Sequence, residues 1–182
     1  NLRRTGLVVI SFSYRGSWGS QGNYTFSGAI DDAVCVAEWV HDEKNAAQYH
    51  IDRNNIFFIG HSMGGFVSIN VTRRIPWLKG TAVMSPYDLP YWPAHGLDAA
   101  MHELIDSSLY VLHVESPEAI YRDVEYCCQQ GYGIFQAFED IKDRNLYLIR
   151  ASQDYVAPAK TMIEPLWNQL SRHQTTAVQD YD

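Results

Sequence analysis

Apolar and polar residues follow one another along the chain in a pattern that predicts strands and helices in turn. Nearly continuous short apolar runs indicate strands that are covered on both faces. These runs lie at residues 7–14, 55–59, 80–84, 145–150 and 175–179. Longer segments with apolar residues at helical spacing predict helices at residues 28–44, 63–74 and 158–173. Alternation of strands and helices is typical of an α/β protein whose parallel strands are joined by right-handed crossovers.

Residues 87–144 interrupt this alternation and form an insertion with helical character. Prolines and a glycine break its first part, and aromatic residues are frequent there. Helices are expected at residues 99–115, 117–130 and 133–142. Ser116 as N-cap and Gly131 after the last turn define the middle helix best. The insertion is either a cap-like lid over a site or a structural elaboration of the domain.

Composition describes an ordinary globular protein of 182 residues, which is enough for a single domain over residues 1–182 with a real core. The net charge of −7 is spread along the chain, which argues against nucleic acid or an anionic membrane surface as partner. No apolar run is long enough to span a bilayer. The cysteines show no CxxC spacing, so reduced thiols are expected rather than a disulfide framework or a zinc site. They are Cys35, Cys127 and Cys128. We expect a cytoplasmic protein without metal or cofactor.

The segment Gly60-His61-Ser62-Met63-Gly64-Gly65 directly follows a predicted strand and precedes a predicted helix. A serine on such a tight strand-to-helix turn needs small neighbours, because side chains there would collide with the strand and the helix. The turn exposes the hydroxyl and leaves the next backbone N–H at a helix N-terminus, where negative charge is favoured. Ser62 is therefore a candidate nucleophile. It needs a base to accept its proton and donors to stabilise an oxyanion.

Three segments together resemble the α/β-hydrolase fold. They are Ser13-Tyr14-Arg15-Gly16, the glycine-flanked serine turn at residues 60–65, and Ser152-Gln153-Asp154-Tyr155-Val156-Ala157-Pro158. The chain is similar to bacterial serine hydrolases of the esterase, dienelactone-hydrolase and prolyl-oligopeptidase-like group. The similarity covers residues 7–86 and 145–182. It implies a mostly parallel sheet flanked by helices, with residues 87–144 as a cap-like insertion.

The resemblance also implies roles for individual residues. Ser62 would be the nucleophile, and the backbone N–H of Met63 would contribute to the oxyanion hole. Asp154 stands where the catalytic acid of this fold belongs, in the turn after a late strand, and Asp88 is a rival acid after the preceding strand. The loop that begins at Arg15 and contains Trp18 would line the mouth of the site, or would serve loop packing alone.

The catalytic histidine of this fold follows the last strand, and the chain offers no good candidate there. His173 is the single histidine after Asp154, and it lies at the end of a predicted helix, where a cation near the helix C-terminus explains it. We therefore expect the base just beyond Asp182. The strand order of the family, 1-2-4-3-5-6-7-8, makes residues 7–14 the fourth strand and implies that the first three are missing. A chain truncated at both ends is expected to be poorly stable and inactive alone.

The predicted activity is hydrolysis of an ester, thioester or amide bond through an acyl-enzyme on Ser62. The substrate would be a small-molecule acyl ester or a peptide, and a peptidase of the prolyl-oligopeptidase-like type is one alternative. A catalytically inactive hydrolase fold that serves as a binding module is another. It applies if no histidine follows the last strand.

Overall fold

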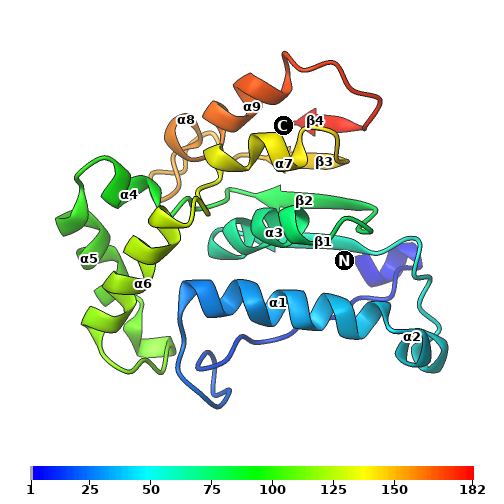
Figure 1. The fold of residues 1–182 in the computed structure, drawn as a ribbon, viewed down its shortest axis with the longest axis horizontal. Helices are drawn as coiled ribbons and strands as arrows, with labels where there is room; N and C mark the ends of the chain where they lie inside the picture. The colour runs from blue at the N-terminus through cyan, green and yellow to red at the C-terminus, as the bar shows by residue number, and fades with distance from the viewer. Residues whose placement is uncertain (1) are drawn as a thin grey trace.

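A computed structural model describes residues 2–182 and contains a four-stranded sheet (Figure 1). The strands lie in chain order and all neighbours are parallel. They are β1 (Phe57–His61), β2 (Gly80–Met84), β3 (Leu146–Ile149) and β4 (Gln179–Tyr181). The α/β class and the parallel sheet are thereby confirmed. The predicted strand at 80–84 matches β2, whereas β1 begins two residues later than expected and β4 lies at 179–181 rather than 175–179.

One face of the sheet is packed against helices. Helix α3 (Met63–Arg74) lies against β1 and β2, and α1 (Phe26–His41) packs onto α3 (Figure 1). Side chains that point to this face, such as Val83 and Leu148, have no exposed surface. Alternate residues of the strands point to the opposite face. There, large apolar side chains remain 38–54% exposed. They are Phe57, Ile59, Met84 and Tyr147.

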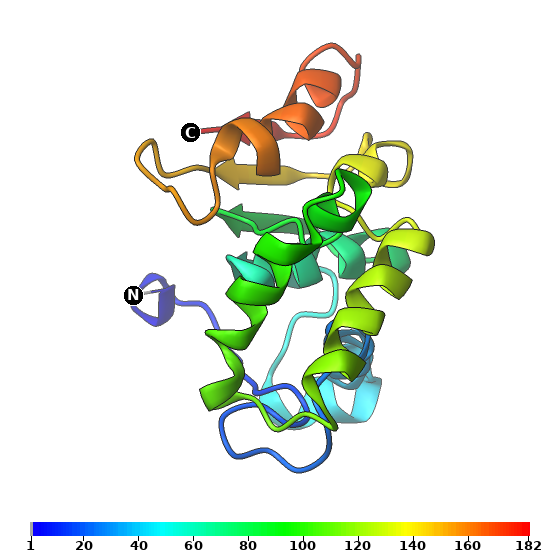
Figure 2. The same ribbon diagram turned by 90° about the vertical axis from the view of Figure 1, so that its left-hand side faces the viewer.

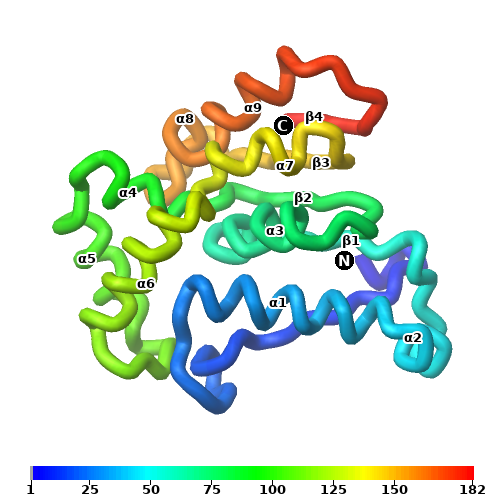
Figure 3. The backbone as a smooth tube through the Cα atoms, viewed as in Figure 1, coloured from blue at the N-terminus to red at the C-terminus, as the bar shows by residue number. Residues whose placement is uncertain are grey.

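The predicted strand at residues 7–14 is not formed. After a 3-10 turn, η1 (Leu2–Thr5), the chain runs irregularly, and residues 7–10 are 43–63% exposed (Figure 3). A cavity of about 530 Å³ separates residues 7–12 from β1 and is lined by apolar side chains of both. A strand requires a neighbour for its backbone hydrogen bonds. The apolar run predicted a buried strand, but the segment has no strand beside it and its first residues are exposed.

Two predicted helices are each divided into two. The helix expected at 28–44 consists of α1 and α2 (Glu43–Tyr49), because Asp42 leaves the helical conformation with ψ 135° and caps α2 through Asn45 N–H. The helix expected at 158–173 consists of α8 (Ala159–Met162) and α9 (Glu164–Leu170). Proline in the first turn of α9 has no N–H for a continuous helix. Apolar periodicity is insensitive to such local breaks.

The insertion contains short helices that are fastened to the rest of the fold. Figure 2 shows α5 and α6 side by side. Its elements are α4 (Tyr91–Ala94), α5 (Asp98–Asp106), η2 (Leu109–Val111), α6 (Pro117–Gln129), η3 (Phe135–Ala137) and α7 (Phe138–Ile141). The α6 prediction is confirmed, with the Ser116 hydroxyl accepting from Ala119 N–H, whereas the helices expected at 99–115 and 133–142 are shorter. Asp123 of α6 accepts hydrogen bonds from Phe26 N–H and Ser27 N–H at the start of α1. No helix within residues 2–182 has the length and apolar character needed to cross a membrane.

Candidate active site

Ser62 lies between the end of β1 and the first turn of α3. Its φ of +55° and ψ of −122° are unusual for a residue with a side chain and mark backbone strain. The Ser62 N–H donates to Met84 O (3.0 Å), and the Ser62 carbonyl accepts from Tyr87 N–H (3.0 Å). Its hydroxyl makes no capping bond to α3. Hydrogen bonds to the last residue of β2 and to the segment after it therefore hold the strained backbone of Ser62, whereas its hydroxyl is not used as a helix cap.

The glycines around Ser62 are required by close backbone approaches. A Cβ at Gly60 would lie 2.0 Å from Gly64 O, and a Cβ at Gly65 would lie 2.7 Å from Pro86 Cβ. Neither separation is possible for real atoms. The expected tight turn, with small residues on both sides of the serine, is thus present in the structure.

Met63 is the first residue of α3, so its backbone N–H has no acceptor within the helix. Its thioether sulfur lies 3.3 Å from the hydroxyl of Tyr24, which is buried. Burial raises the pKa of Tyr24. The Tyr24 hydroxyl thus supports the Met63 side chain, and the Met63 N–H lies at the N-terminal, positive end of α3.

Asp154 lies in the turn after β3, and its carboxylate accepts hydrogen bonds from Ala157 N–H (2.8 Å) and Val156 N–H (3.0 Å). The pKa of Asp154 is lowered, chiefly by the Ala157 N–H, with contributions from the Ser85 side chain and from His61. Ser85 follows β2 directly after Met84, whose carbonyl accepts from Ser62. The nucleophile candidate and the acid candidate thus lie at the same edge of the sheet, on either side of the exit of β2.

Asp88, the rival acid, is directed into the protein. It is 5% exposed, and its Oδ1 accepts a hydrogen bond from Ile134 N–H (3.0 Å) in the insertion. Burial raises the pKa of Asp88 to about 7, against the opposing effects of the Ile134 and Phe135 N–H groups and of His95. A carboxyl group in this position links the insertion to the segment that follows β2.

No histidine among residues 2–182 is hydrogen-bonded to Ser62 or Asp154. The Nε2 of His173 lies 2.9 Å from Asp143 Oδ1. Asp143 precedes β3, so this pair occupies the edge of the sheet opposite to Asp154. Beyond β4, Asp182 N–H donates to Leu148 O (3.0 Å), and Arg150 N–H donates to Asp182 O (2.7 Å). Asp182 thus lies beside the carboxyl end of β3, from which the chain leads to the Asp154 turn.

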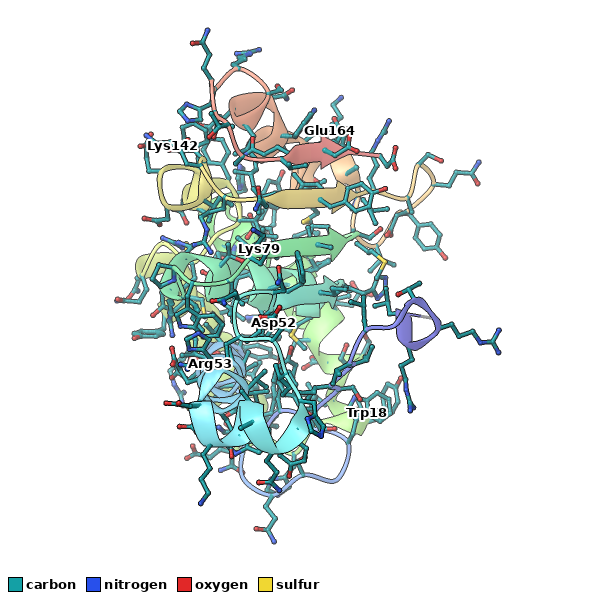
Figure 4. The ribbon with its side chains drawn as sticks, turned by 90° about the vertical axis from the view of Figure 1, so that its right-hand side faces the viewer. Trp18, Asp52, Arg53, Lys79, Lys142 and Glu164 are labelled. Atoms are coloured by element: carbon teal, nitrogen blue, oxygen red, sulfur yellow. The ribbon has the colours of Figure 1, made fainter. Side chains whose placement is uncertain are left out.

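Arg15 and Trp18 differ in what they offer to a ligand. The Arg15 guanidinium is paired with Asp32, to which the Arg15 N–H also donates (2.8 Å). Trp18 has a φ of +50° and is 75% exposed. Figure 4 shows it toward the side to which the strands point. This arrangement suits packing for Arg15 and contact with a ligand for Trp18.

Two residues near the carboxyl ends of the strands were not predicted from the sequence to belong to the site. The Ser85 side chain contributes to the lowered pKa of Asp154, and Ser85 has a φ of +41°. Its position directly after a predicted strand was the available signal. Tyr24 supports Met63, but a tyrosine 39 positions away gives no local indication of that contact. Within residues 2–182, no group of three or more histidine, cysteine or carboxylate side chains could hold a metal ion.

The comparisons with known proteins point to one fold family. A family model described as the alpha/beta hydrolase fold matches residues 2–121. The lysophosphatidylserine lipase ABHD12 of Xenopus tropicalis is 35% identical over 74 residues, which are 41% of this chain and 17% of that protein.

Solved structures show the same architecture at low identity. Esterase Est22 has a TM-score of 0.60 at 20% identity, over 89% of this chain and 48% of that one. Puromycin hydrolase has a TM-score of 0.59 at 16% identity, over 93% of this chain and 22% of that one. A lipase-esterase related protein from Clostridium acetobutylicum has a TM-score of 0.52 at 17% identity, over 90% and 69%. The chain thus spans less than half the length of Est22, puromycin hydrolase and the ABHD12 lipase. It belongs to the alpha/beta hydrolase fold family.

Proposed function

We propose that the protein carrying this chain is a serine hydrolase that cleaves an ester, thioester or amide bond through an acyl-enzyme on Ser62. The observation that carries the proposal is the strained backbone of Ser62, with φ +55° and a hydroxyl that does not cap α3. Such strain costs of the order of 1–3 kcal/mol and persists where it serves a function. The family assignment and the structures of esterase Est22 and puromycin hydrolase, which have the same fold, support it.

The proposed reaction uses three groups at the strand ends. The Ser62 hydroxyl attacks the substrate carbonyl while a histidine accepts its proton, and the Met63 N–H stabilises the oxyanion. Asp154, ionised and held by two backbone N–H groups, orients that histidine. We place the histidine shortly after Asp182, because Asp182 lies beside the carboxyl end of β3 and Asp154 lies in the turn that follows β3. The leaving group departs with the proton, and water then releases the acyl group.

Additional chain is expected on the exposed face of the sheet and in the cavity beside β1. Parallel sheets occur almost only with both faces covered. Apolar side chains of β1 to β3 are 38–54% exposed here. We propose that other segments of the full-length protein cover them.

Covalent labelling tests the role of Ser62. The full-length protein should react with a fluorophosphonate probe, and Ser62→Ala should abolish the reaction. Ser107→Ala is the matched control, because this serine lies after α5 in the insertion and is exposed. Labelling that survives Ser62→Ala would reject Ser62 as nucleophile.

A binding module without catalysis is the second candidate. It is favoured by one observation: among residues 2–182, no histidine is hydrogen-bonded to Asp154. Full-length protein that never reacts with the probe, although correctly folded by circular dichroism, would support this candidate instead. In that case the site between Ser62 and Asp154 would bind a ligand without cleaving it.

A further inference from the structure

Tyr14 lies in a rigid setting beside the first turn of α3. Its carbonyl accepts hydrogen bonds from Ser17 N–H (3.1 Å) and from the Ser17 hydroxyl (2.8 Å). The next residue, Arg15, is fixed to Asp32 through both its backbone N–H and its guanidinium. The ring of Tyr14 packs edge-to-face against Phe12, with centroids 5.5 Å apart. Both the backbone and the ring are therefore held in place.

The hydroxyl of Tyr14, in contrast, is unused. No hydrogen bond among residues 2–182 involves it, yet it is not one of the buried polar atoms without a partner. It is therefore accessible to solvent, although most of the ring is buried. Burial and the nearby Asp32 raise the pKa of Tyr14 to about 12, so the hydroxyl keeps its proton and acts as a donor. A rigid, accessible donor without a partner is suited to receive a ligand atom.

The position of this hydroxyl relates it to the serine turn. A Cβ at Gly64 would lie 4.0 Å from Tyr14 Oη, which is the nearest atom outside helix α3. Gly64 is two residues after Ser62 and one after Met63. Because Gly64 has no side chain, nothing of its own stands between the phenol and the N-terminal turn of α3.

The neighbouring Tyr24 provides a contrast. Its ring is 6.5 Å from that of Tyr14, and its hydroxyl is directed to the Met63 sulfur at 3.3 Å. Tyr24 is 1% exposed, so no ligand can reach it. The two tyrosines thus support the same turn in different ways: one through a side-chain contact, the other with a hydroxyl that is free.

We propose that the Tyr14 hydroxyl donates a hydrogen bond to the substrate carbonyl oxygen as it becomes the oxyanion, beside the Met63 N–H. The proposal rests on the proposed function and names a further catalytic residue for it. No proton is transferred from Tyr14, and it only stabilises the charge that develops when Ser62 attacks.

The test is Tyr14→Phe in the full-length protein, with p-nitrophenyl acetate as substrate. This change removes an unbonded hydroxyl, so the unfolding midpoint should not change. We expect kcat to fall by roughly a hundredfold with KM nearly unchanged. Affinity for a trifluoromethyl ketone, which forms an oxyanion on the serine, should fall by a similar factor. Tyr110→Phe, at an 86% exposed position in η2, is the control and should leave kcat unchanged.

A kcat within about threefold of the unmodified protein, or an unchanged affinity for the ketone, would overturn the proposal. These outcomes are distinguishable from failure of the proposed function. The fluorophosphonate probe must still label Ser62 in the Tyr14→Phe protein, only more slowly. If the unmodified protein is not labelled at Ser62 at all, the proposed function fails first and the role given to Tyr14 falls with it.

Discussion

Replacing Asp88 by asparagine tests how much a buried negative charge lowers the free energy of unfolding of this fold. Asp88 is the buried charged residue of the described chain, at 5% exposure, and it lies where β2 leads into the insertion. Its Oδ1 accepts from Ile134 N–H, and its own N–H contacts the Met162 sulfur. Asparagine keeps an oxygen for the Ile134 N–H and cannot ionise. The change therefore removes the charge and leaves the main contact in place.

The magnitude follows from the pKa of Asp88, which burial raises from the ordinary 3.8 to about 7. Between these values the folded state binds a proton that the unfolded state has lost. The free energy of unfolding therefore falls as pH rises, by about 1.4 kcal/mol per pH unit. Above pH 7 the full penalty is of the order of 4 kcal/mol, and below pH 3.8 it is absent. For a domain with a total stability of about 5–15 kcal/mol, this is a large effect.

Urea unfolding followed by tryptophan fluorescence measures it. The Asp88→Asn protein should exceed the unmodified protein in stability at pH 8 by up to about 4 kcal/mol, and the difference should vanish or reverse near pH 4. Glu103→Gln, at an exposed position on α5, should change little at any pH. If the stability difference at pH 8 equals that at pH 4, Asp88 is not titrating as described and the reasoning is refuted.

Three further predictions follow from the same contacts. Arg144→Lys should lower the free energy of unfolding by about 1–3 kcal/mol, because the guanidinium donates to three backbone carbonyls at 3.0–3.1 Å. Urea unfolding measures this effect, and Arg172→Lys is the neutral control. Asp154→Asn should lower kcat of the full-length protein by about 10⁴-fold while circular dichroism is unchanged; a normal kcat would exclude it as the acid. Gly65→Ala should destabilise by about 1–3 kcal/mol and slow fluorophosphonate labelling, because its Cβ would meet Pro86 at 2.7 Å; unchanged rates would contradict this.

The parallel core of the fold could be predicted because its signals are local. The strand at 80–84 and helices α3 and α6 have apolar runs or caps that define them without outside help. The error at residues 7–14 has a different origin. An apolar run indicates a tendency to be buried, but a strand also needs a neighbouring strand for its backbone hydrogen bonds. Here residues 7–12 are separated from β1 by a cavity of about 530 Å³.

The candidate site could be predicted only in part for the same reason. Ser62 and its glycines lie within six consecutive residues, and their pattern encodes the turn directly. Asp154 could be located from its place after a late strand. The contacts of Tyr14 and Tyr24 with the α3 turn join residues 39 to 50 positions apart, and they depend on tertiary packing that no short motif reports.

The two candidate acids show how environment rather than sequence position assigns a role. Asp88 and Asp154 follow neighbouring parallel strands, so spacing alone favours either. Asp154 receives two backbone N–H groups near solvent, which lowers its pKa and keeps it ionised. Asp88 is desolvated, and its pKa rises to about 7. An acid that must stabilise a cationic histidine has to carry charge near neutral pH. On this physical ground Asp154 fits the proposed triad, and Asp88 fits a structural link to the insertion.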